Sequence, residues 1–181
     1  MTIAAARSPA PPRVVVSGAL ALLPEIARLT AGGAEVVAAD RDLPALLAAT
    51  GTMGGLSCLS VDPDLTLDAR RLSSAIRRLG GCEVFVHHLG GGDGSAPAFL
   101  GAMRLLHTVR PQMARGCDGL IALTGATGAC ARSLAIVLDR AGTFRAGTGP
   151  RIVQCDPRDL PGLLDEAVAR MRPAAALPLA G

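Results

Sequence analysis

Short apolar stretches alternate along this chain with longer segments in which apolar residues recur at helical spacing. The short stretches predict strands at 14–16, 35–39, 56–61, 83–88, 119–124 and 151–155. The longer segments predict helices at 22–31, 43–49, 67–79, 98–114, 129–141 and 160–171. Pro111 is expected to bend or break the fourth helix. Strands that alternate with helices run parallel with right-handed crossovers, so we expect an α/β fold: a Rossmann-like, doubly wound parallel sheet of about six strands with helices on both faces.

A chain of 181 residues with 50% hydrophobic content suits one core of ordinary size, and we expect a single domain. The expected parts are a flexible leader at 1–12, the Rossmann-like domain at 13–172 and a loose tail at 173–181. No apolar run has the length of a signal peptide or a membrane span. The expectation is therefore a soluble, cytoplasmic protein without membrane contact.

Charge and cysteine content change this picture little. All 18 basic residues are Arg, balanced by 15 acidic residues for a net charge of +3. Because the Arg residues are spread along the chain and aromatic residues make up 2%, we expect no nucleic-acid partner. The five Cys stand far apart without the Cys/His spacing of a metal site, which predicts reduced, buried thiols and no metal.

Several segments resemble, in order and spacing, the motifs of the short-chain dehydrogenase/reductase family. Residues 83–90, EVFVHHLG, fall where that family has a strand ending in Asn-Asn-Ala-Gly. Residues 105–116 resemble its long interface helix, 120–125 its fifth strand and 131–135 its next helix. The resemblance implies a Rossmann-like domain built to bind NAD(P). Vestiges of that cofactor site would be Gly18, Asp40, Asp62 and Gly90.

The glycine-rich turn of the family, Thr-Gly-x-x-x-Gly-x-Gly, is mostly missing here. The corresponding residues 17–24 retain Gly18 but have Leu22 and Pro24 in place of the later glycines. A bulky side chain obstructs the approach of a pyrophosphate, and proline removes an N–H that could meet it. Asp40 could still accept from a ribose hydroxyl, or it could cap a turn. We therefore expect no cofactor, and in particular no NAD(P) bound in the usual pose.

The catalytic residues that the resemblance implies are missing as well. The family uses a Tyr general acid/base, a Lys that lowers its pKa and a Ser that orients the carbonyl. This chain contains neither Tyr nor Lys, and the Ser position corresponds to Gly125, with the hydroxyl of Thr124 beside it. The expectation is a degenerate, truncated family member that has lost redox catalysis.

Two histidines are candidates for other chemistry. His87 and His88 end a predicted strand, where open α/β sheets collect ligands, and a glycine-rich loop containing Asp93 follows them. Successive strand residues point to opposite faces, so at most one histidine is expected to face a crevice. A histidine there could act as a general base, or both could hydrogen-bond the backbone as structural residues. The candidate catalytic residues are His87, His88, Thr124 and Asp93.

Three functions remain open from the sequence. In the first, the chain is a non-catalytic subunit in a biosynthetic or metabolic pathway, forming a homo-oligomer or pairing with an active dehydrogenase relative. Helices 98–114 and 129–141 would form the interface, because the first carries apolar residues on more than one face: Leu100, Met103, Leu106 and Val109. In the second, it is a cofactor-independent cyclase, dehydratase or isomerase with a histidine acid/base. In the third, it binds a nucleotide or another small-molecule ligand.

Overall fold

The structure is a computed structural model that describes residues 10–90, 96–113, 119–126, 132–133, 136–137 and 150–171. Most of the expected leader, the expected tail, Asp93 and most of the expected helix at 129–141 lie outside the described residues.

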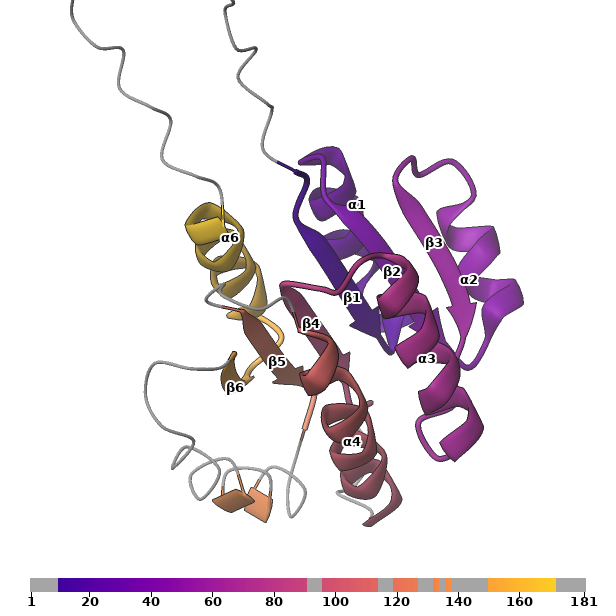
Figure 1. Cartoon of the computed structure of the whole chain (residues 1–181), viewed down its shortest axis with the longest axis vertical. Coiled ribbons are helices and arrows are strands. Elements are labelled where there is room, and N and C mark those ends of the chain that lie inside the picture. The colour runs from indigo at the N-terminus through magenta and orange to yellow at the C-terminus, as the bar shows by residue number, and fades with distance from the viewer. Residues whose placement is uncertain are drawn as a thin grey trace, which may run out of the picture.

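Six parallel strands form one sheet in the order β3-β2-β1-β4-β5-β6 (Figure 1). The strands are β1 (Arg13–Ser17), β2 (Glu35–Asp40), β3 (Leu56–Ser60), β4 (Val84–His88), β5 (Leu120–Thr124) and β6 (Arg151–Cys155). The strand order reverses between β1 and β4, so their carboxyl ends flank the switch point where such sheets bind ligands. The expected Rossmann-like architecture is confirmed.

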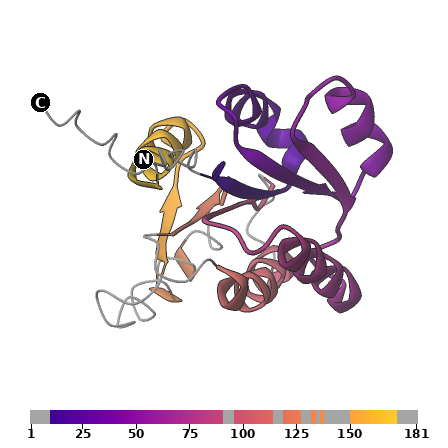
Figure 2. The same cartoon turned by 45° about the horizontal axis from the view of Figure 1, so that its top comes forward.

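Helices cover both faces of this sheet, as Figure 2 shows. The helices are η1 (Ala19–Leu22), α1 (Leu23–Ala31), α2 (Leu43–Thr50), α3 (Thr66–Arg78), α4 (Ala96–Val109), η2 (Arg110–Gln112) and α6 (Leu160–Met171). The expected break near Pro111 is confirmed, because α4 ends at Val109 and a 3-10 turn that contains this proline follows. Within the described part of the chain, no helix has the length and apolar content of a membrane span.

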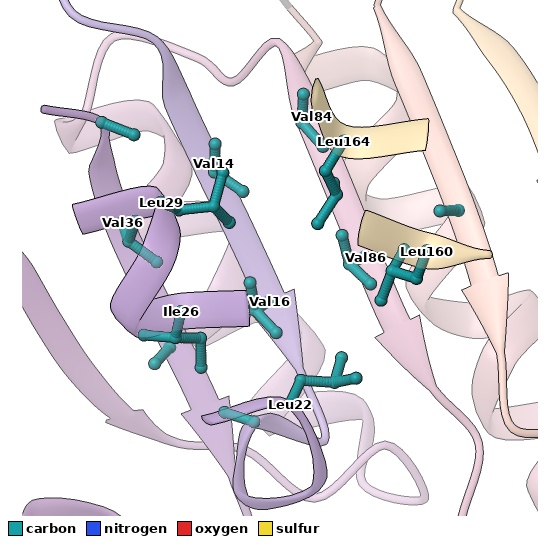
Figure 3. Packing of buried hydrophobic residues seen from close by; sticks show 14 of the residues in the cluster. Val14, Val16, Leu22, Ile26, Leu29, Val36, Val84, Val86, Leu160 and Leu164 are labelled. Carbon is teal, nitrogen blue, oxygen red and sulfur yellow. The ribbon is translucent and has the colours of Figure 1, made fainter. Parts of the chain in front are cut away.

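Alternating strand residues build a separate core on each face. On one face, α1 and α6 place Ile26 and Leu160 against Val14, Val16 and Val86 (Figure 3). On the other face, residues of α3 and α4 pack against Val15, Val37, Phe85 and Ile121. The two cores hold the ends of β1 and β4 in register, and these ends carry the polar residues of the crevice.

Helix α4 buries most of the apolar residues that were expected to face a partner. Leu106 and Val109 are 6% and 0% exposed, and Met103 packs against the same core. Leu100 is 57% exposed. Of the four residues expected on a partner-facing surface, Leu100 is therefore the one that α4 presents to solvent, because the other three pack toward the sheet.

Candidate functional site

A pocket of about 550 Å³ opens at the switch point of the sheet. Its walls come from the turn after β1, the ends of β2 and β4, the segment that leads into α3 and the start of α4. This volume lies within the range of small-molecule sites. The polar residues that line the pocket include Asp40, Asp64, His87 and His88.

In the turn between β1 and η1, three backbone N–H groups donate to acceptors within the protein. Gly18, at a φ of 72°, donates its N–H to the carbonyl of Ala39 at 3.0 Å. The N–H of Leu20 donates to the carboxylate of Asp40 at 2.9 Å, and that of Ala21 donates to the carbonyl of Gly18 at 3.3 Å. Leu22 is 3% exposed and belongs to the core that α1 covers. Where a dinucleotide fold offers N–H groups to a pyrophosphate, this chain has bonded them internally.

Asp40 is an unneutralised carboxylate at the end of β2. It accepts the N–H groups of Leu20 and Asp42, and among the described residues no arginine forms an ion pair with it. Arg41, the next residue, pairs instead with Asp62 at 3.0 Å and with Asp64. Asp62, which the resemblance placed in the cofactor site, is thus held in an ion pair with Arg41.

His87 is buried at the end of β4, with 3% of its surface exposed. Its ring stacks on Phe85 with 6.4 Å between centroids, and the backbone of Ser17 hydrogen-bonds to it. Burial, with a smaller contribution from His88, lowers the pKa of His87 to about 4, although the bond to Ser17 opposes this shift. Nδ1 of this ring is a buried atom without a hydrogen-bond partner among the described residues. The neutral ring has one nitrogen that donates and one that accepts.

His88 occupies the space between the ends of β1 and β5. A Cβ added at Gly125 would lie 2.4 Å from Cε1 of the His88 ring, and one added at Gly18 would lie 2.6 Å from the His88 carbonyl oxygen. Burial lowers the pKa of His88, whereas the nearby Asp40 raises it. Its Nδ1 also lacks a partner. The absence of a side chain at Gly125, which the resemblance places at the family's serine position, is thus what makes room for the His88 ring.

Both histidines line the pocket, which differs from the expectation that at most one would face it. Their side chains do leave opposite faces of the sheet, because Phe85 and Val86 before them belong to different cores. However, β4 ends at His88, and the pocket extends around that end. Gly90, at a φ of 68°, also lines the pocket. Asp93 lies outside the described residues, so its relation to the histidines stays a prediction.

Sequence analysis named Thr124 as a candidate residue but missed Cys155, which strand register brings beside it. His88 is level with Thr124 on β5, and Thr124 is level with Cys155 on β6. Thr124 is fully buried, and its hydroxyl has no nitrogen or oxygen partner among the described residues; the thiol of Cys155 beside it is a weak hydrogen-bonding group. Burial raises the pKa of that thiol, and the Thr124 hydroxyl opposes this. The sequence signal that could have predicted this grouping is that His88, Thr124 and Cys155 each end a parallel strand.

The described residues hold no group of three His, Cys, Asp or Glu side chains that could bind a metal ion. The candidate chemistry of the site therefore rests on hydrogen bonding, charge and the two imidazoles.

No family sequence model and no curated protein sequence matches this chain. Solved structures do match in fold. A short-chain dehydrogenase/reductase from Burkholderia phymatum in complex with NAD is 19% identical, with a TM-score of 0.63 over 97% of this chain and 75% of that one. A 3-ketoacyl-(acyl-carrier-protein) reductase from Brucella melitensis complexed with NADH is 16% identical, with a TM-score of 0.64 over 81% of this chain and 74% of that one. A glucose/ribitol dehydrogenase of the same family from Brucella melitensis is 18% identical, with a TM-score of 0.62 over 83% and 76%. At these identities the likeness establishes architecture, and this chain has the fold of the short-chain dehydrogenases/reductases.

Proposed function

We propose that this chain is a short-chain dehydrogenase/reductase-like protein that has lost the redox active site and serves as a non-catalytic partner subunit in a biosynthetic or metabolic pathway. The bond from the Leu20 N–H to the Asp40 carboxylate carries the first half of this proposal. A pyrophosphate in the usual pose would meet that carboxylate in place of a free N–H group. The absence of Tyr and Lys from the sequence removes the family's proton-transfer pair.

Isothermal titration with NAD and NADP tests the loss of cofactor binding. We expect no binding tighter than about 1 mM, which corresponds to about −4 kcal/mol. The Brucella melitensis reductase that was crystallised with NADH serves as the positive control. A dissociation constant of about 1 μM for either cofactor would contradict the proposal.

The partner role is supported by exposed apolar residues on the two helical segments expected to pair. Leu100 of α4 is 57% exposed, and Ile136, in the helical residues 136–137, is 56% exposed. Leucine and isoleucine side chains exposed to this extent gain free energy when a partner covers them. A charge placed at such a position in an interface loses that gain and adds a desolvation cost.

Size-exclusion chromatography of an extract from the native host tests this role. We expect the chain to elute above its mass of 18.3 kDa and the Leu100→Asp variant to elute as a monomer. Leu47→Asp is the matched control, because Leu47 is 51% exposed on α2. Elution of the unmodified chain as a monomer, or a Leu100→Asp variant that elutes with the unmodified chain, would contradict the partner role.

A second candidate is a cofactor-independent cyclase, dehydratase or isomerase. The observation that favours it is the presence of two imidazoles at one pocket, both with a pKa that burial lowers. Either could take a proton from a small carbonyl compound. In the reconstituted pathway, His87→Gln or His88→Gln would then lower turnover by about 10²- to 10⁴-fold, whereas Leu100→Asp would not. The partner role predicts the opposite pattern.

A further inference from the structure

We infer that the pocket at the ends of β1, β2 and β4 binds a small organic cation, of the amidinium, guanidinium or protonated-amine class, and excludes phosphate groups. This inference rests on the charges and hydrogen bonds of the pocket and holds whether or not the chain pairs with another subunit.

Asp40 provides the negative charge. Its carboxylate accepts two backbone N–H groups, from Leu20 at 2.9 Å and Asp42 at 3.3 Å, and these leave lone pairs for a further donor. Arg41 does not neutralise it, because this guanidinium pairs with Asp62 and Asp64. A carboxylate in a partly enclosed pocket attracts a cation more strongly than one in bulk water. A ligand N–H on a positive group is the natural partner for it.

His87 and His88 also line the pocket, and they add no positive charge to it. Burial lowers the pKa of both imidazoles, so both rings are neutral at pH 7. Nδ1 of each ring is a buried atom that faces the protein and does not face the pocket. The Asp40 carboxylate therefore carries the charge that a ligand meets in this pocket.

The pocket disfavours phosphate, because three of the N–H groups at the turn after β1 are not free to donate to it. The N–H groups of Gly18, Leu20 and Ala21, at the start of the first helix, already donate within the protein. An anion would face the Asp40 carboxylate without these donors. Arg41 also lines the pocket, but its guanidinium is paired with Asp62 and with Asp64, which lies on the same wall. The apolar part of the wall includes Leu20, Val61 and Leu89, which can pack against a hydrocarbon body.

Benzamidine, benzamide and benzoate form a matched series of probes, because they share a ring and differ in charge at one group. The chain has three histidines, so the imidazole proton signals of the unmodified protein report the position of binding by NMR at pH 7. We expect benzamidine to shift the signals of His87 and His88 but not that of His107, which is exposed on α4. Its affinity should exceed that of benzamide at least ten-fold, and benzoate should produce no shift.

Asp40→Asn tests the residue that carries the charge. The amide oxygen can still accept the Leu20 N–H, so the turn is retained while the charge is lost. We expect benzamidine binding to weaken about ten-fold, whereas Asp165→Asn, an exposed carboxylate on α6 outside the pocket, leaves it unchanged. Equal affinity for benzamidine and benzamide, shifts with benzoate, or an unchanged affinity of the Asp40→Asn variant would each overturn the inference. If this variant does not fold, the comparison of the three probes on the unmodified protein decides the question alone.

Discussion

The two halves of the sheet's carboxyl edge differ in whether their polar groups have hydrogen-bond or ion-pair partners. On the β1-β2-β3 side, Asp40 accepts backbone N–H groups, Arg41 pairs with two carboxylates, and Asp62 donates its N–H to Asp68 at 2.9 Å. On the β4-β5-β6 side, buried side-chain atoms lack nitrogen or oxygen partners among the described residues. These atoms are Nδ1 of His87, Nδ1 of His88, Oγ1 of Thr124 and Oε1 of Gln154.

This difference indicates which half of the edge has polar groups that a ligand could complete. Buried polar groups in native proteins are nearly always paired, so unpaired ones mark places where a ligand or another group completes the structure. In the β1-β2-β3 half, the turn after β1 bonds its N–H groups within the protein. In the β4-β5-β6 half, buried polar atoms lack nitrogen or oxygen partners among the described residues. Four measurements probe this comparison, in order of decreasing expected effect.

Leu22→Ala tests whether the segment after β1 is part of the core. Leu22 is 3% exposed among the residues that α1 covers, so its truncation should lower the free energy of unfolding by about 2–5 kcal/mol. Urea unfolding followed by circular dichroism measures this loss. Leu47→Ala, at a site 51% exposed, is the control and should change stability by less than about 1 kcal/mol. Equal losses in the two variants would show that Leu22 has no structural role beyond an ordinary surface leucine.

His87 should make stability fall in acid. Its pKa in the folded protein is about 4, below the ordinary value of 6.5, so the unfolded chain takes up the proton first as the pH falls. This contribution to stability is fully present above pH 6.5 and is lost as the pH falls toward 4, by about 3 kcal/mol. Urea unfolding at pH 7 and pH 4 measures the loss.

The same experiment on variants separates His87 from the acidic residues that also titrate in this range. His87→Gln should show a smaller loss between the two pH values, and His107→Gln, at an exposed site, should show the loss of the unmodified protein. A loss that stays the same in His87→Gln would place the titrating group elsewhere.

Gly125→Ala tests the packing of His88 against β5. The new Cβ would meet the His88 ring at 2.4 Å, and the φ of 74° disfavours any side chain. Gly90→Ala is the matched control, because Gly90 has a similar φ of 68° but a Cβ there would meet nothing within 4 Å. We expect the first substitution to cost about 1–3 kcal/mol more than the second in thermal or urea unfolding. A difference near zero would mean that the His88 ring moves aside without cost.

Thr124→Val should have the smallest effect. The Thr124 hydroxyl lacks a nitrogen or oxygen partner among the described residues, so its removal should leave stability within about 1 kcal/mol of the unmodified protein or raise it. Thr50→Val is the contrast, since the Thr50 hydroxyl donates to the carbonyl of Leu46 at 2.7 Å. That variant should lose about 0.5–1.5 kcal/mol by differential scanning calorimetry. The reverse order would indicate that Thr124 has a bound partner in solution.

The sequence predicted the frame of the molecule well. The six strands and the break at Pro111 follow from apolar periodicity and from local backbone chemistry, which near neighbours in the chain determine. The loss of the glycine-rich turn was likewise visible, because Leu22 and Pro24 stand at defined positions after β1.

The site was predicted in part. His87, His88 and Asp40 were identified as candidates because strand ends in this fold collect ligands. Their relation was not predicted, because the pocket extends around the end of β4 and admits both histidines. The apolar residues of α4 were assigned to a partner surface, whereas the sheet buries Leu106 and Val109, since helical spacing alone does not say which face meets the core.

By itself, the sequence determined the order of the elements and the chemistry that is absent, because both depend on residue identity and local spacing. Tertiary structure alone decided which groups meet. Asp40 reaches the Leu20 N–H across 20 residues, and His88 lies over Gly125 across a parallel crossover. Strand register decides which residues become neighbours at the edge of the sheet, and register is specified where both faces of the sheet are buried in cores.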